Sequence, residues 1–116
     1  MIRLFPESDL KKADRSTREA QPMIQGEKRA MFVIRDGEHL RAYANSCPHR
    51  WVELNWKPNK FLSLDRLDIQ CTQHGARFLI ENGLCISGPC TGMRLESFPV
   101  CVKEGWIVLE MPSKNH

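Results

Sequence analysis

Three pairs of short β-rich runs, each pair joined by a tight turn, limit the possible folds of this chain more than any other feature. The paired runs are residues 29–35 with 39–44, 76–80 with 84–86, and 100–103 with 106–110. The connecting turns are Asp36-Gly37, residues 81–83 and Glu104-Gly105. Two apolar runs around such a turn are a strong local signal of a β-hairpin. Regularly spaced hairpins predict an all-β fold, built of small antiparallel sheets as a sandwich or barrel.

The size and composition of the chain favour one ordinary globular domain over residues 1–116. Its residues are 41% apolar and 27% charged, and the formal net charge is only +3. The charges of both signs are interspersed, which argues against a nucleic-acid partner. The longest purely apolar run, residues 30–34, is far shorter than the roughly 20 residues of a membrane-spanning helix. The N-terminal residues lack the pattern of a secretion signal, so we expect a cytoplasmic protein with reduced thiols. Residues 7–21 are polar and predict a helical turn or a loop.

Two short motifs each place a cysteine close to a histidine. The first is Cys47-x-His49 and the second is Cys71-x-x-His74, with residues 50–70 between them. Each motif follows a run expected to be a strand, so two loops projecting from a β scaffold would carry all four side chains. Cysteine and histidine are common metal ligands, and we interpret these four residues as one binding site.

The other cysteines and histidines fit a structural role. Isolated cysteines are usually small buried apolar residues, which suits Cys85 and Cys101 on expected strands. His39 in a hairpin and His116 in the C-terminal tail need no special role. Cys90 lies near a turn and is interpreted as a thiol outside the site.

The pairing of unlike ligands bears on the choice of metal. Two thiolates and two imidazoles suit either zinc or an iron–sulfur cluster. Structural zinc sites usually pair like ligands at short spacings, whereas each motif here mixes one cysteine with one histidine. In a [2Fe–2S] cluster with thiolates on one iron and imidazoles on the other, each loop must supply one ligand to each iron. A motif with one cysteine and one histidine meets this requirement. A zinc-stabilised β module for binding is the alternative.

The stretches "CPHRWVEL" and "CTQHGARF", followed by Gly88-Pro89, resemble the pattern of Rieske-domain proteins of the small soluble ferredoxin type. The resemblance covers nearly the whole chain. It implies one Rieske-type [2Fe–2S] cluster, held by two loops in a cluster-binding part at about residues 45–92. The ligands carried over by position are Cys47, His49, Cys71 and His74. The remaining matches to the pattern are Leu54, Gly75, Phe78 and Gly88-Pro89.

The chain departs from the family pattern at positions that are not ligands. Trp51 stands where the family favours glycine, Glu53 where a small residue or proline is frequent, and Gln73 where tryptophan is frequent. Residues 55–61 predict an extra loop between the motifs. These departures bear on the tuning of the cluster rather than on its binding.

The resemblance also bears on the reduction potential. High-potential members carry a disulfide beneath the cluster and hydroxyl groups that donate hydrogen bonds to its sulfur atoms. The matching positions here are Val52 and Gln73 for the disulfide, and Ala76 and Phe78 for the hydroxyls. Loss of such hydrogen bonds lowers the potential, so we expect the low end of the class range.

The resemblance implies a one-electron carrier rather than an enzyme, passing electrons from a reductase to a terminal oxygenase, as a monomer without nucleic-acid or membrane partners. A catalytic oxygenase would need a further iron site with two histidines and a carboxylate. Only His39 and His116 remain as histidines for such an iron site, and the chain is too short for a catalytic domain. We therefore reject the hypothesis of a catalytic oxygenase. A protein like the small subunit of nitrite reductase is a further alternative, although such subunits often lack the cluster ligands that are present here.

Overall fold

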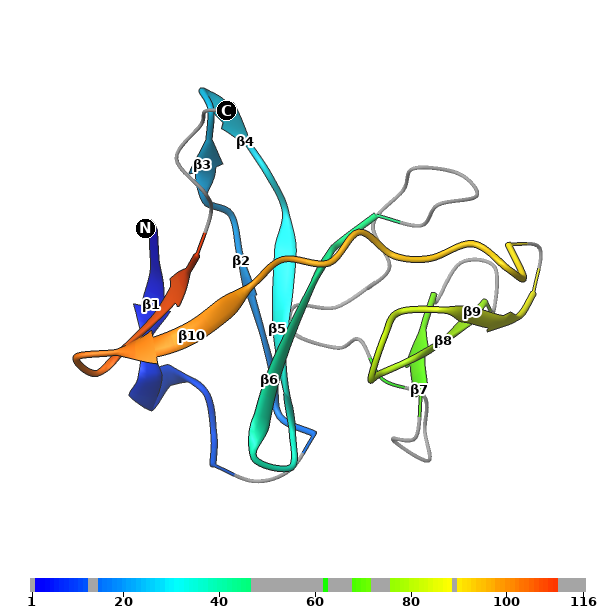
Figure 1. Ribbon diagram of the computed structural model, residues 1–116, viewed down its shortest axis with the longest axis horizontal. Helices are drawn as coiled ribbons and strands as arrows, with labels where there is room; N and C mark the ends of the chain where they lie inside the picture. Colours follow the sequence, from blue (N-terminus) through cyan, green and yellow to red (C-terminus); the bar gives the residue numbers. More distant parts are fainter. Residues whose placement is uncertain are drawn as a thin grey trace.

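The computed structural model describes residues 2–12, 15–46, 62, 68–71, 76–88 and 90–110. The elements are β1 (Ile2–Pro6), the 3-10 helix η1 (Glu7–Asp9), β2 (Thr17–Ala20), β3 (Met23–Ile24), β4 (Glu27–Lys28), β5 (Met31–Asp36), β6 (His39–Ala44), β7 (Asp68–Gln70), β8 (Arg77–Leu79), β9 (Cys85–Ser87), β10 (Val100–Lys103) and β11 (Trp106–Leu109). They form antiparallel sheets of order β1-β11-β10, β2-β5-β6, β3-β4 and β7-β8-β9 (Figure 1). The prediction of an all-β fold of small antiparallel sheets is confirmed. Among these residues no helix has the length and apolar character needed to cross a membrane.

The three predicted hairpins are present as β5–β6, β8–β9 and β10–β11. In the first, Asp36 pairs with His39 and Gly37 adopts a φ of 62°. In the last, the two turn residues Glu104 and Gly105 both have positive φ, as a type I′ turn requires. The turn of β10–β11 therefore lies at the predicted Glu104-Gly105, whereas Asp36 still pairs within β5 and the turn of β5–β6 lies at Gly37-Glu38, one residue later than predicted.

The N-terminal part contains strands that the sequence did not reveal. A 3-10 turn does lie within residues 7–21, but β2 in the same range is a strand that pairs with β5, with Thr17 opposite Ile34 and Ala20 opposite Met31. All four residues of β2 are half-buried, and they show no alternation of apolar and polar side chains. Its pairing is determined by the exposed edge of β5 rather than by local preference.

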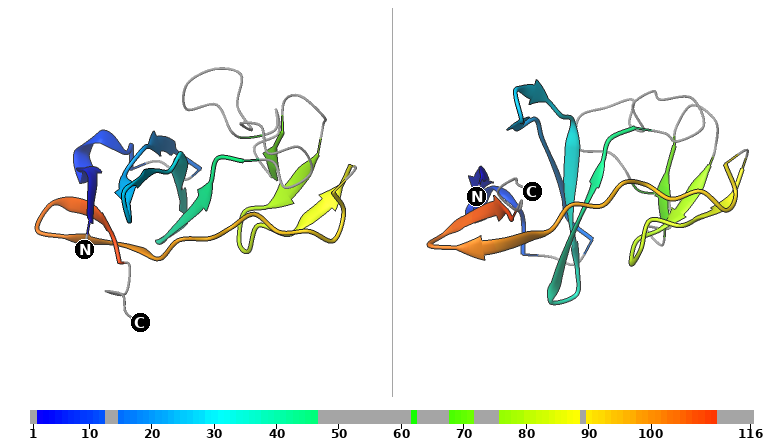
Figure 2. Two further views of the ribbon diagram at one scale, coloured as in Figure 1. Left: turned by 90° about the horizontal axis from the view of Figure 1, so that it is seen from above. Right: turned by 45° about the horizontal axis from the view of Figure 1, so that its top comes forward.

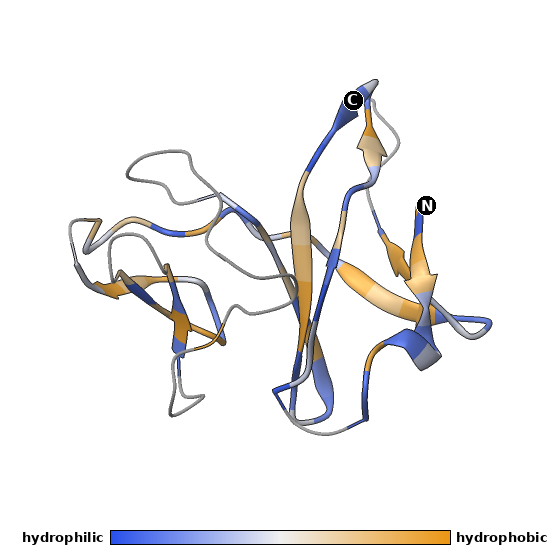
Figure 3. Cartoon of the chain, turned by 180° about the vertical axis from the view of Figure 1, so that it is seen from behind, coloured by the Kyte–Doolittle hydropathy of each residue, from blue (hydrophilic) through white to orange (hydrophobic). Residues whose placement is uncertain are grey.

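The central sheet separates two hydrophobic cores. On β5, Met31 and Val33 pack into a core shared with β1 and β11, whereas Phe32 and Ile34 pack into a core shared with the β7-β8-β9 sheet. All four side chains are fully buried. A strand covered on both faces is apolar at successive positions rather than at alternate ones, and Figure 3 shows this for most of β5 beside the more hydrophilic β2. The left view of Figure 2 shows the three larger sheets in a row.

The segment of residues 94–98 ties the β7-β8-β9 sheet to the central sheet. The Leu95 amide donates to the carbonyl of Gly83, at the turn between β8 and β9, over 3.0 Å. The Ala44 amide of β6 donates to Glu96 over 2.8 Å, and the Phe98 amide donates to Ala42 over 2.9 Å. In Figure 1 this segment runs from β9 past the end of β6 to β10. These backbone hydrogen bonds thus hold the β7-β8-β9 sheet against the central sheet.

Tyr43 makes the corresponding side-chain connection between β6 and the end of β8. Its hydroxyl donates to the carbonyl of Ile80 over 2.5 Å, and its ring lies 6.0 Å from that of Phe32. The side chain is buried, which disfavours the phenolate and raises the pKa of Tyr43 to about 12.

Replacing Tyr43 by Phe should remove a stabilisation that depends on pH. The pKa of Tyr43 in the folded protein lies above the ordinary value of 10.0, so its contribution is complete below pH 10 and is lost as the pH rises to 12. At pH 7 we expect Tyr43→Phe to lower the free energy of unfolding by about 1 kcal/mol. Between pH 10 and 12 the wild-type protein should lose roughly 2–3 kcal/mol more than the variant. Urea unfolding at a series of pH values measures both quantities, and parallel curves would contradict the assignment.

Candidate metal centre

The second Cys/His motif begins where β7 ends. Cys71 follows Gln70, the last residue of β7, and Gln70 pairs with Arg77, the first residue of β8. The Cys71 amide donates to the carbonyl of Ala76 over 2.8 Å. This hydrogen bond joins the two ends of the second loop, the segment between Cys71 and Ala76 that contains His74 in the sequence. Cys71 is completely buried, as expected for a ligand shielded from water.

The first motif begins shortly after the end of β6. Asn45 follows the last residue of this strand, and its amide donates to Ala30 over 3.0 Å. Asn45 is also the one buried polar residue among those that the structure describes. Cys47 comes two residues later in the sequence. Both motifs therefore follow the ends of paired strands, as predicted.

Most of the predicted site lies outside the described residues. This applies to Cys47, His49 and His74, to Trp51, Glu53 and Gln73, and to the loop 55–61. Among the described residues, no group of three or more His, Cys, Asp and Glu side chains could hold a metal ion. The four-ligand set therefore stays a prediction, and the described part offers no competing site.

The turn after β9 packs directly against the second motif. Gly88 has a φ of 101°, and a Cβ at this position would lie 2.8 Å from Cα of Ala76. The turn is held by Thr91, whose hydroxyl donates to the carbonyl of Gly88 over 2.7 Å. Ala76 is also the residue that accepts the amide of Cys71. Gly88 therefore supports the base of the second loop, a contact that the sequence motif alone did not reveal.

The two buried residues described just after the second loop, Ala76 and Phe78, have no hydroxyl groups. Ala76 and Phe78 are both fully buried and belong to the same hydrophobic cluster as Cys71. Arg77, between them, is 40% exposed and forms an ion pair with Asp68 at 3.4 Å. Successive side chains of a strand point to opposite faces, so the guanidinium lies on the other face of β8 from Phe78. A buried cysteine among small and apolar side chains fits a thiolate ligand that is kept from water.

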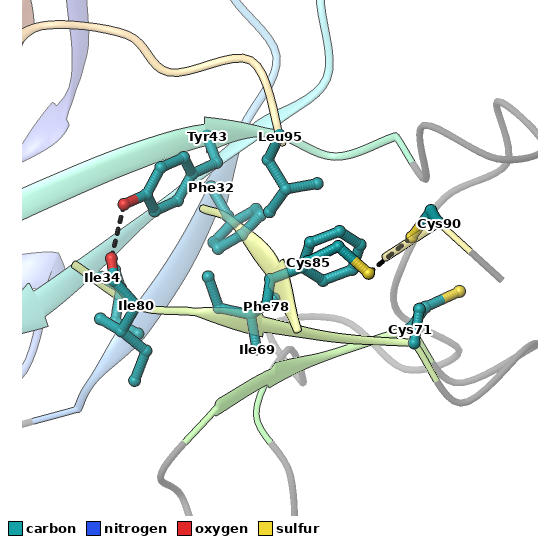
Figure 4. Close-up of a cluster of buried hydrophobic side chains, with 11 residues drawn as sticks. Phe32, Ile34, Tyr43, Ile69, Cys71, Phe78, Ile80, Cys85, Cys90 and Leu95 are labelled. Atoms are coloured by element: carbon teal, nitrogen blue, oxygen red, sulfur yellow. Dashed lines mark hydrogen bonds between the residues drawn. The ribbon is translucent and has the colours of Figure 1, made fainter. Parts of the chain in front are cut away.

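Two further cysteines lie in this cluster, although sequence reasoning assigned them no common role. Cys85 opens β9 and Cys90 lies in the turn after it, and each is 1% exposed. Their Sγ atoms are 2.9 Å apart. Figure 4 shows the sulfur atoms of Cys71, Cys85 and Cys90 toward one end of the cluster, away from Tyr43. The short spacing of the two cysteines around Gly88 is visible in the sequence, but it does not show that their sulfur atoms meet. None of the four described cysteines is in a disulfide.

The two residues just before the first motif help to line a hollow with cationic side chains. The hollow has a volume of about 650 Å³, and its lining includes Asn45 and Ser46 just before the motif. Lys28, Arg29 and Arg94 contribute positive charge to the lining. Arg29 forms an ion pair with Glu96, which lines the same hollow. The balance of charge around the hollow is positive.

Comparison with known families gives one match over most of the chain. The model of the Rieske [2Fe-2S] domain matches residues 2–99, a range that contains both Cys/His motifs and Gly88-Pro89. None of the curated proteins matches the chain.

Solved structures similar to the chain include ferredoxins and oxygenases. The Sphingomonas yanoikuyae B1 ferredoxin is 23% identical, with a TM-score of 0.70 over 96% of this chain and 98% of that one. A chain from the complex of reduced oxygenase and oxidized ferredoxin in carbazole 1,9a-dioxygenase is 28% identical, with a TM-score of 0.70 over 93% of this chain and 90% of that one. The terminal oxygenase of carbazole 1,9a-dioxygenase from Novosphingobium sp. KA1 is 21% identical, with a TM-score of 0.74 over 97% of this chain but 30% of that one. The first and third similarities, at such low identity, establish the fold alone.

Proposed function

Because the chain belongs to the Rieske [2Fe-2S] domain family, we propose that it is a one-electron carrier that passes electrons from a reductase to a terminal oxygenase. The match over residues 2–99 carries this proposal, since it includes both cluster-binding motifs. The oxygenase as partner is supported by the 28% identical chain from a complex of oxygenase and ferredoxin. That similarity extends over nearly the full length of both chains. The predicted family and its [2Fe–2S] cofactor are confirmed.

We assign the ligands to Cys47, His49, Cys71 and His74, in a cluster-binding part at residues 45–92 of a single domain spanning 1–116. Two thiolates leave an oxidised [2Fe–2S] core neutral, whereas four would leave it a dianion, so histidine ligation favours uptake of an electron. The cluster, when bound, supplies the one-electron chemistry. The proposal includes a cytoplasmic monomer, and a reducing compartment would keep the free thiols from pairing in disulfides before the cluster is inserted.

The side chains around Cys71 support a low reduction potential. Ala76 and Phe78 are buried beside the second loop and have no hydroxyl to donate. Arg77 is held by Asp68 on the other face of β8, so its charge does little to favour the reduced state. Within the class range of about −150 to +300 mV, we expect a potential below zero that is almost independent of pH near neutrality.

The cationic hollow lined by Asn45 and Ser46, the two residues before the first motif, is a candidate docking place for the partner. Lys28 and Arg94 are exposed on its lining, and the first motif follows directly after its other lining residues Asn45 and Ser46. A partner with an acidic surface would be attracted to this side, and the association rate would fall with ionic strength. The double substitution Lys28→Glu with Arg94→Glu should therefore slow electron transfer to the partner without changing the potential.

The decisive experiment measures three properties of the anaerobically purified protein: its iron and sulfide content, its reduction potential, and its rate of electron transfer to an oxygenase. We expect iron and labile sulfide in equal amounts, a reduced-state EPR spectrum of mixed nitrogen and sulfur ligation, and a negative midpoint by voltammetry. Single-turnover mixing of the reduced protein with a terminal oxygenase of the carbazole dioxygenase type should oxidise it, and more slowly for the Lys28/Arg94 variant. Zinc without iron would contradict the cofactor. A loaded protein with a potential near the top of the class range would contradict the assignment to the ferredoxin type.

A further inference from the structure

We propose that Cys85 and Cys90 form a second redox site, in which a two-electron oxidation joins their sulfur atoms in a disulfide across the Gly88 turn. This site is separate from the four proposed cluster ligands. It also requires no electron transfer through the cluster, so it goes beyond the proposed carrier function and can fail independently of it.

The distance between the two sulfur atoms is the first observation. At 2.9 Å, it is shorter than the usual contact between two unbonded sulfur atoms and longer than the S–S bond of about 2.05 Å. Both side chains are 1% exposed within one hydrophobic cluster, so neighbouring atoms hold them together (Figure 4). Bond formation needs a small movement of the side chains.

The backbone around the pair is already fixed by hydrogen bonds. The Cys85 amide donates to Met93 over 2.8 Å, and the Gly92 amide donates back to Cys85 over 3.0 Å. The Met93 amide also donates to the carbonyl of Cys90 over 2.8 Å. Both cysteines therefore belong to one closed loop, and the fold itself supplies the proximity that favours ring closure.

The thiol form has an ordered pattern of donors. The Cys90 thiol donates to Sγ of Cys85, and the Cys85 thiol donates to the carbonyl of Ser87 over 3.3 Å. Oxidation removes both thiol protons and leaves the Ser87 carbonyl to water, since Ser87 is exposed. Of the groups in these two hydrogen bonds, only the Ser87 carbonyl remains as a polar group that has lost its partner, and its residue is exposed, so water can replace the thiol at little desolvation cost.

The oxidant is a low-molecular-weight disulfide, and the exchange is balanced. The thiolate of one cysteine attacks the small disulfide, forms a mixed disulfide and releases one small thiolate. The thiolate of the second cysteine then attacks the protein sulfur of the mixed disulfide, and a second small thiolate leaves. Two thiol protons pass to the released thiolates, and excess small thiol reverses both steps. Because both cysteines are buried, the exchange occurs during brief openings of the Gly88 turn.

The location gives the disulfide a consequence for the cluster loop. Gly88 lies between the two cysteines in the sequence and packs on Ala76, which accepts the amide of Cys71. Linking Cys85 to Cys90 restrains this turn against the base of the second loop. We expect the form with the Cys85–Cys90 disulfide to lose its cluster to a chelator more slowly than the form with two free thiols.

Mass spectrometry of the holoprotein tests the proposal directly. The protein is equilibrated with glutathione and increasing glutathione disulfide, quenched in acid, denatured, alkylated with iodoacetamide and digested with trypsin. The peptide of residues 78–94 contains Cys85 and Cys90 and no other cysteine. With rising glutathione disulfide, this peptide should change from doubly alkylated to unalkylated and two hydrogens lighter, while the visible spectrum persists. Cys101, in the peptide of residues 95–103, should form at most a mixed disulfide with glutathione, as should Cys85 in the Cys90→Ser variant.

The time that the buried thiols need to become accessible is measured in a parallel sample without oxidant. Alkylation of the native holoprotein by iodoacetamide measures how fast the turn exposes the two thiols, and the equilibration is run beyond that time. If the thiols become alkylated in this sample but the oxidised sample keeps both thiols or carries only glutathione, the pair does not close and the proposal is overturned. If the thiols never react with either reagent in the native protein, the site is inert and the proposal is equally overturned.

Discussion

Replacing Cys71 by serine should abolish the visible absorption of the purified protein, whereas Cys101→Ser should leave it unchanged. Serine oxygen is a poor substitute for a thiolate on iron, and Cys71 stands at the closed base of the second loop. Cys101 lies on β10, outside both hydrophobic clusters, and is the matched control. Absorption spectra and iron content of variants prepared side by side measure the result.

The same loss is expected for Cys47→Ala, His49→Ala and His74→Ala, because an incomplete ligand set does not retain the cluster. Cys90→Ser is the informative neighbour, since its thiol is buried in the same cluster as Cys71 but is not a proposed ligand. Retention of the spectrum in Cys71→Ser together with bleaching in Cys90→Ser would show that the second motif has been aligned wrongly.

Gly88→Ala should be strongly destabilising although Gly88 is not a proposed ligand, and Gly92→Ala is its matched control. Both glycines have a φ near 100°, so both substitutions force an L-residue into left-handed backbone at a cost of about 1 kcal/mol. Only at Gly88 would the new Cβ also meet backbone, with Cα of Ala76 at 2.8 Å, while nothing lies within 4 Å at Gly92. Overpacking of this kind costs roughly 1–3 kcal/mol more.

We therefore expect the free energy of unfolding to fall by about 2–4 kcal/mol for Gly88→Ala and by about 1 kcal/mol for Gly92→Ala. The first variant should also lose its cluster faster, because Ala76 must move and takes the base of the second loop with it. Urea unfolding and the decay of visible absorption under a chelator measure the two effects. Equal losses in the two variants would mean that the contact between Gly88 and Ala76 has no energetic weight.

Local turn chemistry explains which parts of this fold could be predicted. Gly37 and Gly105 mark their hairpins because both have positive φ, a backbone conformation that few other residues adopt. The strands β1 and β2 escaped prediction because their partners are distant in sequence. Residues of β2 have no apolar alternation, and they become a strand only when β5 offers an edge. Such elements depend on tertiary context, which a local pattern does not contain.

At the candidate site, too, features that are local in the sequence could be predicted, whereas contacts between distant residues could not. The pattern of Cys47, His49, Cys71 and His74 identified the family, because the ligand chemistry demands those residue types at short spacings. The contact of Gly88 with Ala76 and the approach of Cys85 to Cys90 arise when a turn folds back onto the neighbouring strand. Two cysteines near a Gly-Pro turn look alike in sequence whether their sulfur atoms meet or diverge, so their pairing could not be predicted.

The pairing of β1 with β11 has a consequence during synthesis of the chain. Ile2 lies opposite Leu109, so β1 is synthesised long before its partner strand β11. Until then Phe5, which is buried in the finished core, has no sheet to join. The hairpin β5–β6, whose strands are neighbours in sequence, can form long before. Strands far apart in sequence pair slowly, so β1 stays unpaired in the nascent chain until β11 has been made, and we expect it to be a target for chaperones during that time.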